Sequence, residues 1–355
     1  MSGLEGVVAA ETKLSMVDGE KGELIIAGYP VEELAPHATF EQTVELLWGR
    51  PFERGSQPSV LTLALLAAAA KRQADPMDAL RMATATLSGK DDDDAARNLL
   101  AAFPVIVAAY WRLLHGQAPI APRADLGHAA NYLYMLTGDV PPPARVRGLE
   151  TYLNTVVDHG LNASTFTARV ITSTGSDFVS AITGAIGALK GPLHGGAPGP
   201  ALDMVFEIGD VARAEKVLRQ KIESGERLMG FGHRVYKVRD PRADVLAAAA
   251  EKMLGPGNAL YDLARGVEAV ALRLLEEYKP GRRLQTNVEF YTALVLHGIG
   301  LEVPLFTPTF AISRVAGWIA HCFEQRRANR LIRPQSAYIG PRGLRWRAPA
   351  AQPAM

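Results

Sequence analysis

The pattern of apolar and polar positions along the chain is helical over most of its length. Apolar residues recur three or four positions apart, the spacing that places them on one face of an α-helix. One strand signal stands out, where the turn-like sequence VDGEKG precedes Gly22 to Tyr29 and predicts a β-hairpin. The remaining pattern predicts helices over Val60 to Arg72, Ala95 to Leu114, Leu126 to Thr137, Ala144 to Val157, Thr165 to Ser173, Asp177 to Leu189, Val211 to Ser224, Pro241 to Met253, Ala259 to Tyr278, Val288 to His297 and Thr309 to Arg327.

Glycine and proline divide these helices. They cluster in the stretches GPLHGGAPGP, MGFGH, LGPGN and YKPGRR, which lie between predicted helices and do not follow strands. That context disfavours a Rossmann dinucleotide site, and the absence of a G-x-x-x-x-G-K-[ST] sequence disfavours a P-loop. We therefore expect an all-α protein, and the length of 355 residues indicates two domains.

Composition excludes several classes of protein. With 48% hydrophobic residues and a formal net charge of +1, the chain should bury a substantial core and should not attract nucleic acid or a membrane over its whole surface. No apolar run approaches the roughly 20 uncharged residues that a bilayer span requires. The N-terminal sequence lacks a basic segment followed by an apolar one, so we expect a cytoplasmic protein.

The single cysteine and the densest acidic run have structural interpretations. Cys322 alone excludes an intrachain disulfide framework and a multi-cysteine metal site, and its helical context predicts a buried thiol. The run Asp91 to Asp94 could hold a metal ion. A helix start, where acidic side chains interact favourably with the helix dipole, is the simpler interpretation.

Three of the eight histidines stand in glycine-containing loops. His159, His194 and His233 each lie next to glycine, which lets the backbone approach a ligand closely. They lack the i, i+4 spacing of a helix-borne metal pair, so we interpret them as hydrogen-bonding and proton-transfer groups and not as metal ligands. The other histidines are expected to be structural: His37, His115, His128, His297 and His321.

The stretch MGFGHRVYKVRDPR places one histidine beside a concentration of positive charge. The planar fork of arginine holds a carboxylate with two hydrogen bonds, so arginines beside neutral imidazoles would suit a small polycarboxylic acid. The arginines in question are Arg242, Arg314 and Arg333. Lys237 and Arg239, from the same stretch as His233, could hold phosphates. For any isolated arginine, a helix cap or a surface ion pair is the alternative.

A series of ordered blocks spans nearly the whole chain: GLEGVVAAET, DGEKGELIIAGY, LGHAANYLYMLTG, DHGLNASTFTARV, ALKGPLHGGA, GFGHRVYKVRDPR, NVEFYTALVLHGIG and LFTPTFAISRVAGWIAHCFEQRRANRLIRPQSAYIGP. Together they resemble the citrate synthase family. The resemblance implies an all-helical homodimer, with a large domain of residues 1–200 and 305–355 and a small domain of residues 201–304. It also implies condensation of an acyl-CoA with oxaloacetate and hydrolysis of the thioester, with no metal and no tightly bound cofactor.

Carried over position by position, the family's motifs imply roles at the reacting atoms. His194 would donate a hydrogen bond to the thioester carbonyl as the enol develops, which stabilises charge that is present only in the transition state. His233 would polarise the ketone of oxaloacetate and deliver a proton as the new carbon–carbon bond forms. Glu289 would remove the α-proton of the acyl group.

The resemblance also implies how the substrates are held. Arg333, in an RP-x-S context, would reach into the partner subunit's site. Lys237 and Arg239 would contact the phosphates of CoA. The residues implied for the dicarboxylate are His159, Arg242 and Arg314.

Two stretches depart from the family's usual pattern. Glu289 replaces an aspartate, and Thr286 replaces a proline three residues earlier; after LHGGA, where Asn-Glu is common, this chain has Pro198 and Gly199. The first change alters the base and the second could reshape the loop of His194. Thr286 and Glu289 also have the spacing of a capping box, in which the glutamate would turn back to its own helix end.

Three functions stay open. The leading one is a citrate synthase-type enzyme, with 2-methylcitrate synthesis from propionyl-CoA as an alternative, because one methylene changes discrimination by only about 1–3 kcal/mol. The second is a weakly active or regulatory homologue that binds oxaloacetate or CoA. The third is nucleic-acid binding by the C-terminus, where seven arginines face one acid between Glu324 and Arg347. A tail that wraps a dimer partner explains those arginines better, so we expect neither nucleic acid nor a membrane as a partner.

Overall fold

The structure is a computed structural model that describes residue 4 and residues 6–195, 198–233, 235–255 and 257–344. It is 59% helix and 4% strand, which confirms the all-α prediction and the small β element near the N-terminus. The sheet is antiparallel, with strand order β1 (Ser15–Asp18), β2 (Glu23–Ile26), β3 (Tyr29–Pro30). The predicted hairpin region contains β2 and the beginning of β3, whereas β1 lies before it and ends inside the stretch VDGEKG that was predicted to be a turn.

Every helix predicted from the hydrophobic pattern is present, with ends shifted by a few residues. The Asp91 side chain accepts the N–H of Asp94 at the start of α5, so the acidic run begins a helix as predicted. The predicted helices are α3 (Val60–Lys71), α5 (Asp92–Leu114), α6 (His128–Thr137), α7 (Pro143–Val156), α8 (Ala163–Ser173), α9 (Phe178–Leu189), α11 (Val211–Glu223), α12 (Pro241–Leu254), α13 (Ala259–Tyr278), α14 (Val288–Ile299) and α15 (Phe306–Arg327).

Several shorter helices were not predicted. The most consequential is α10, because the stretch GPLHGGAPGP was expected to be a loop to its end, and yet the helix begins at Pro198. Proline is tolerated in a first turn because its missing N–H would have no intrahelical partner there. These helices are α1 (Val31–Leu34), α2 (Phe40–Trp48), α4 (Pro76–Thr84), α10 (Pro198–Ile208) and the 3-10 helix η1 (Val303–Leu305).

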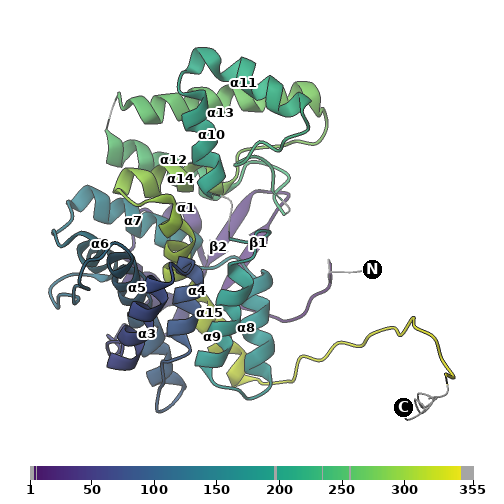
Figure 1. The fold of residues 1–355 in the computed structure, drawn as a ribbon. Helices are drawn as coiled ribbons and strands as arrows, with labels where there is room; N and C mark the ends of the chain where they lie inside the picture. Colours follow the sequence, from purple (N-terminus) through teal and green to yellow (C-terminus); the bar gives the residue numbers. More distant parts are fainter. Residues whose placement is uncertain (1–3, 5, 196–197, 234, 256, 345–355) are drawn as a thin grey trace, which may run out of the picture.

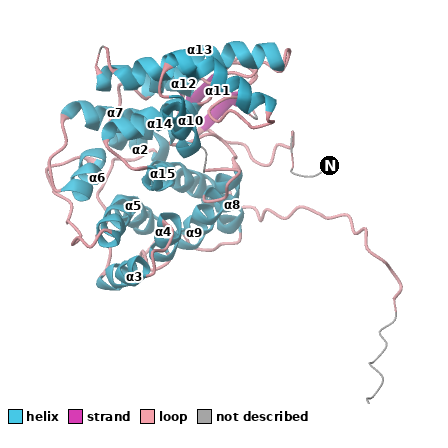
Figure 2. Cartoon of the chain, turned by 45° about the horizontal axis from the view of Figure 1, so that its top comes forward, coloured by secondary structure: helices cyan, strands magenta, loops and turns pink. Residues whose placement is uncertain are grey.

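Helix α15 runs through the middle of the larger group of helices (Figures 1 and 2). It contacts α2, α5, α7, α8 and α9, and nearly all its side chains from Phe306 to Phe323 are buried. A helix covered on every side is typical of a protein interior. Its polar residues Arg314 and His321 are therefore buried as well, and each needs a polar partner.

Helices α10 to α14 lie together at one end of the molecule (Figure 1). Helix α11 packs against α13, while α12 packs against both α14 and α7 and so joins this group to the rest. The group occupies most of the predicted small domain, whose limits stay a prediction. The turn between β1 and β2 also reaches this group, since the backbone N–H of Lys237 donates to the carbonyl of Gly19 at 2.8 Å.

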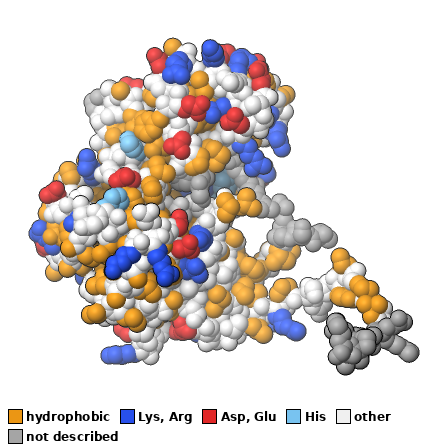
Figure 3. All heavy atoms as spheres, viewed as in Figure 1, with side chains coloured by type: hydrophobic (Ala, Val, Ile, Leu, Met, Phe, Trp, Pro, Cys, Tyr) orange, Lys and Arg blue, Asp and Glu red, His pale blue; other side chains and the backbone are white. Residues whose placement is uncertain are grey.

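In the described part of the chain, α5 is long and apolar enough to cross a membrane, and α14 with residues 303–327 passes the same test across a bend of 115°. Most of the apolar stretch of α5 is buried against α3, α4, α6 and α15, as in the core helix of a folded domain. On the face drawn in Figure 3, acidic and basic side chains are interspersed, in keeping with the small net charge.

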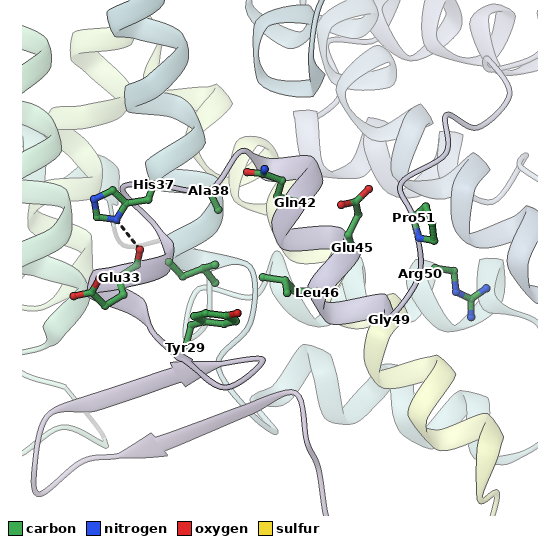
Figure 4. A pocket seen from close by; sticks show the side chains of 11 residues that line it. Tyr29, Glu33, His37, Ala38, Gln42, Glu45, Leu46, Gly49, Arg50 and Pro51 are labelled. Atoms are coloured by element: carbon green, nitrogen blue, oxygen red, sulfur yellow. Dashed lines mark hydrogen bonds between the residues drawn. The ribbon is translucent and has the colours of Figure 1, made fainter.

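A hollow of about 630 Å³ lies beside α1 and α2 (Figure 4). Tyr29, Leu46 and Arg50 line it, together with His37, whose Nδ1 lies 2.8 Å from the carbonyl of Glu33. That bond ties the His37 ring to its own turn, in keeping with a structural role. The residues singled out for chemistry do not line this hollow, so the candidate site must lie elsewhere.

Candidate active site

The loop that carries His233 is attached to the start of α14. Gly230 and Gly232 have φ of +86° and +82°, a region that disfavours other residues, and a Cβ on Gly230 would lie 2.9 Å from Phe290. The Asn287 N–H donates to the Gly230 carbonyl at 2.9 Å, and the Asn287 side chain donates to the Gly232 carbonyl at 2.7 Å. The glycines of MGFGH therefore allow the close approach that places His233 next to α14.

The imidazole of His233 is held as one tautomer. Its Nδ1 accepts the backbone N–H groups of Val235 at 3.0 Å and Tyr236 at 3.1 Å, so the neutral ring carries its proton on Nε2. Burial, followed by the charge of Arg242, lowers the pKa of His233 to about 4. At neutral pH the ring is thus a neutral donor through Nε2.

His159 lies against the same loop. Its ring centroid is 5.7 Å from that of His233, and its Nε2 is 3.2 Å from the hydroxyl of Tyr236. Burial and then the charges of Arg242 and Arg314 hold the pKa of His159 well below its usual value. The structure therefore brings together two of the three glycine-flanked histidines, and both are neutral.

Two buried arginines complete this side of the site. Arg242 donates through Nε and Nη2 to Asp240 at 3.0 and 2.8 Å, and Asp240 also accepts the Val288 N–H at 3.1 Å. Arg314 donates through Nε to the Val156 carbonyl at 2.7 Å, and no hydrogen bond to a described residue is seen for its two terminal nitrogens. Burial lowers the pKa of Arg314 to about 10, so it stays charged at neutral pH with its fork available.

His194, the third glycine-flanked histidine, contacts a polar network on α8 and α15. Its Nε2 lies 2.8 Å from the hydroxyl of Ser164, which also accepts the indole N–H of Trp318 at 3.0 Å. Burial and then the charge of Arg314 lower the pKa of His194 to about 4. Because the charge of Arg314 lowers the pKa of both His159 and His194, this arginine interacts electrostatically with both rings.

Glu289 does not form the capping box that its spacing allows. The N-cap of α14 is Asn287, whose side chain accepts the Glu289 N–H at 3.0 Å, while the Thr286 hydroxyl donates to Glu268. Burial raises the pKa of Glu289 to about 7, against the opposing charges of Arg242 and Arg314. Its carboxyl is therefore part of the same electrostatic cluster and titrates near neutrality.

The remaining predicted residues lie farther from this cluster. Arg239 forms ion pairs with Asp244 at 2.5 Å and Glu268 at 2.8 Å, so its guanidinium is engaged within the protein. The Lys237 side chain is exposed on the His233 loop, and Arg333 is exposed on the extended segment that leaves the fold after α15 (Figure 1). Their assignment to CoA phosphates and to a partner's site stays a prediction.

Sequence reasoning missed residues that complete the site. Ser164 and Trp318 position His194, and Tyr152 is buried on α7 with a pKa raised by burial and then by Glu289, which places its hydroxyl within the same electrostatic cluster. Trp318 and Tyr152 fit the apolar pattern of their helices, and Ser164 is a common residue in the first turn of a helix, so no local signal distinguishes them.

The residues predicted to be structural behave accordingly. Cys322 is buried, and burial raises the pKa of its thiol to about 12. His321 bridges Asp158 at 3.1 Å and Arg169 at 3.0 Å in the interior of the large group of helices. Within the described ranges, no group of three or more His, Cys, Asp or Glu side chains is arranged to hold a metal ion.

Comparison with known proteins identifies the family. The family model "Citrate synthase, C-terminal domain" matches residues 3–335, a span that includes every residue of the site. The chain belongs to the citrate synthase family. The citrate synthase of Haloferax volcanii is 38% identical over 370 residues, covering 96% of each chain. The 2-methylcitrate synthase of Mycobacterium tuberculosis is 41% identical, over 95% of this chain and 90% of the other.

Solved structures of citrate synthases share the fold. The enzyme from the thermophilic archaeon Thermoplasma acidophilum, solved as a ternary complex with carboxymethyl coenzyme A and oxaloacetate, matches with a TM-score of 0.83 and 30% sequence identity, over 98% of each chain. The recognition made from the ordered blocks is confirmed, and with it the assignment as an acyltransferase that converts acyl groups into alkyl groups on transfer.

Proposed function

We propose that the protein condenses acetyl-CoA with oxaloacetate and hydrolyses the resulting thioester to citrate and CoA. The observation that carries the proposal is the cluster of neutral imidazoles and buried arginines around the Glu289 carboxyl. Arginine forks and neutral imidazoles suit a small dicarboxylate, and a carboxyl with a pKa of about 7 is suited to accept a proton near neutral pH. His159, Arg242 and Arg314 would bind oxaloacetate.

The first step would form the nucleophile. Glu289 takes a proton from the carbon next to the thioester, and the electron pair of that C–H bond moves towards the thioester oxygen. A hydrogen bond from His194 stabilises the negative charge that develops there. For this, the Ser164 hydroxyl, which in the structure donates to Oδ1 of Asn162 at 2.8 Å, would turn its proton to Nε2 of His194, so that the ring proton lies on Nδ1.

The second step would form the carbon–carbon bond. The enol carbon attacks the ketone carbon of oxaloacetate, while Nε2–H of His233 donates its proton to the ketone oxygen, which becomes the hydroxyl of the product. Water then attacks the thioester carbonyl, the C–S bond breaks, and CoA leaves as the thiol with a proton from that water. The proton that Glu289 took would replace the one that His233 gave, so both groups return to their starting states. Lys237 and Arg239 would contact the CoA phosphates.

The proposal includes a homodimer with shared sites. Arg333 follows α15 on the segment that leaves its own fold, so it would meet a carboxylate in the partner subunit's site (Figure 1). The arginine-rich C-terminal segment supports this role better than nucleic-acid binding. It also exposes apolar side chains that a protein partner would cover, such as Ile339, which is 96% exposed.

A thiol-release assay with oxaloacetate and either acetyl-CoA or propionyl-CoA tests the function. The buried thiol of Cys322 should not react with the thiol reagent, so the signal reports free CoA. Faster turnover with propionyl-CoA would favour 2-methylcitrate synthesis, which the 41% identity to the Mycobacterium tuberculosis enzyme supports. Binding of oxaloacetate without thiol release from either acyl-CoA would instead indicate a regulatory homologue.

A further inference from the structure

Glu268 is a buried carboxylate that the proposed reaction does not use. It lies on α13, and 4% of its surface is exposed. Its Oε1 accepts the Thr286 hydroxyl at 2.6 Å and Nη1 of Arg239 at 2.8 Å. Its Oε2 accepts the Tyr291 hydroxyl at 2.6 Å and Nη1 of Arg265 at 3.1 Å. Both oxygens of this buried carboxylate therefore accept hydrogen bonds from two donors each, and Glu268 holds the four donor side chains in place.

Three of these donors belong to the segments that build the site. Arg239 follows His233 on the same loop, whereas Thr286 and Tyr291 flank Glu289 on either side. The same segments are joined through the backbone, where Phe231 and Thr286 form an antiparallel bridge. Glu268 therefore ties the loop of the proton donor to the start of the helix that carries the base.

The oxygen of the Thr286 hydroxyl can lie in one of two places, at the end of α14 or against Glu268. As an N-cap it would accept the N–H of Glu289, and the Glu289 side chain would then bond the N–H of Thr286. In the structure the hydroxyl donates to Glu268, and the cap moves one residue on to Asn287. Glu289 is therefore the second residue of the helix and not the third. At the second position its carboxyl is not drawn back to the N-terminal end of the helix.

We propose that Glu268 is a positioning residue, which holds the Thr286 hydroxyl away from the end of α14 and so leaves the Glu289 carboxyl directed into the site. The inference rests on the proposed function, because Glu289 is the base of that reaction. It assigns Arg239 a structural part, through its ion pair with Glu268 at 2.8 Å, in addition to the predicted phosphate contact.

The test is a rescue experiment. Glu268→Ala frees the Thr286 hydroxyl to cap α14, so the turnover number should fall at least about 10-fold, while KM for oxaloacetate changes less than about twofold. Adding Thr286→Val removes the hydroxyl that would form the cap. The double variant should then recover to within about threefold of the wild type, although it lacks one more hydrogen bond.

Two matched variants serve as controls. Thr286→Val alone should stay within about threefold of the wild type, since it can form no capping box. Arg265→Gln removes another donor to Glu268, one that comes from the same turn of α13 and not from the site. The Arg265 side chain is 52% exposed, so its ion pair with Glu268 is weak and turnover should change less than about twofold. If Glu268→Ala does not fold, Glu268→Met, which fills the same space and has no oxygen to accept the Thr286 hydroxyl, carries the same comparison with and without Thr286→Val.

A double variant no faster than the single one, in an otherwise active enzyme, would overturn the proposal. A ¹³C NMR titration of the Glu289 carboxyl does not depend on enzyme activity, so it separates this outcome from failure of the proposed function. The signal of Glu289 is identified by its absence in Glu289→Gln. The pKa of the Glu289 carboxyl should be near neutrality in the wild type. In Glu268→Ala this pKa should fall towards the ordinary value of a glutamate, because a carboxylate that caps a helix is stabilised in its ionised form. An unchanged titration would equally overturn the proposal.

Discussion

The Nε2 atom of His194 lies 2.8 Å from the hydroxyl oxygen of Ser164, and that hydroxyl lies 2.8 Å from Oδ1 of Asn162. Ser164 has one proton to donate. If the Ser164 proton points to Asn162, the neutral His194 ring must carry its own proton on Nε2, and its Nδ1 has no proton for a substrate. If the Ser164 proton points to Nε2 of His194, the ring proton lies on Nδ1. Ser164 therefore controls which face of the imidazole can donate.

Ser164→Ala should lower the turnover number by about 10- to 100-fold, because His194 loses the group that selects its donating tautomer. KM for oxaloacetate should change little, since the dicarboxylate site is elsewhere in the cluster. Thr165→Val is the matched control, because the buried hydroxyl of Thr165 has no hydrogen-bond partner among the described residues. Steady-state thiol release measures both. Equal turnover in the two variants would remove Ser164 from the mechanism.

Replacing either imidazole at the reacting atoms should have a larger effect. His194→Ala and His233→Ala should each reduce turnover by at least about 100-fold, the scale of lost oxyanion or general-acid assistance. Circular dichroism should show an unchanged helix content. His115→Ala, at the exposed end of α5, should behave as the wild type in both measurements. Near wild-type turnover in both site variants would show that the assigned steps are wrong.

The fold could be predicted because most helices bury one apolar face, and that spacing survives in the sequence. Where other signals compete, the prediction failed. The start of α10 at Pro198 was hidden by a cluster of glycine and proline that usually marks a loop. Helix α2 is also short, although its buried Phe40 and Val44 and its capping box at Thr39 are local signals that could have found it.

The site could be predicted only where the local sequence is unusual. His159 and His233 stand out because glycine flanks them, and their rings lie 5.7 Å apart. The role of Ser164 depends on a contact with Trp318, 154 residues away in the sequence. The capping box at Thr286 is equally favoured by local rules, but in the structure the Thr286 hydroxyl donates to Glu268 and Asn287 caps the helix. Tertiary contacts of this kind override local preferences.

The shared site can be tested by complementation. Arg333→Ala and His233→Ala should each be nearly inactive alone, but a mixture of the two should recover some activity. In a mixed dimer one site keeps both residues, because Arg333 would come from the other subunit. Subunit exchange is measured in parallel by mass spectrometry of the intact dimers. Exchange without any recovered activity would mean that Arg333 serves its own chain's site or none.

The buried histidines should make the protein sensitive to acid. The pKa of His194 and of His233 is about 4 in the folded protein, below the usual value of 6.5. Between these values the unfolded chain binds more protons, so the free energy of unfolding should fall as the pH drops from 6.5 towards 4. Urea denaturation at several pH values measures this slope. The variant with both His194→Asn and His233→Asn should show a shallower slope, and an equal slope would contradict the assignment.

Glu289 should act as the base, and its titration should shape the pH dependence of turnover. Since the pKa is raised to about 7, turnover should rise with pH through that value. Glu289→Gln keeps the shape but cannot take a proton, so condensation should be lost while calorimetry still detects oxaloacetate binding. Glu289→Asp should be slower than the wild type, because its shorter arm leaves the carboxylate roughly 1.5 Å short and a misplacement of about 1 Å can cost on the order of 100-fold in rate.

Stability distinguishes this base from a helix cap. The folded pKa of about 7 lies above the ordinary value of 4.5, so the unfolded chain loses this proton first and the free energy of unfolding falls as the pH rises from 4.5 to 7. Below 4.5 both states are protonated alike. Glu289→Gln should therefore raise the free energy of unfolding at pH 8 by on the order of 1–3 kcal/mol, a range that allows for partial contact of the carboxyl with water. This stabilisation should fade by pH 5. A capping carboxylate would give the opposite sign, because its ionised form stabilises the helix start. A Glu289→Gln variant that is less stable at pH 8, together with a faster Glu289→Asp, would make Glu289 a cap and leave the reaction without its base.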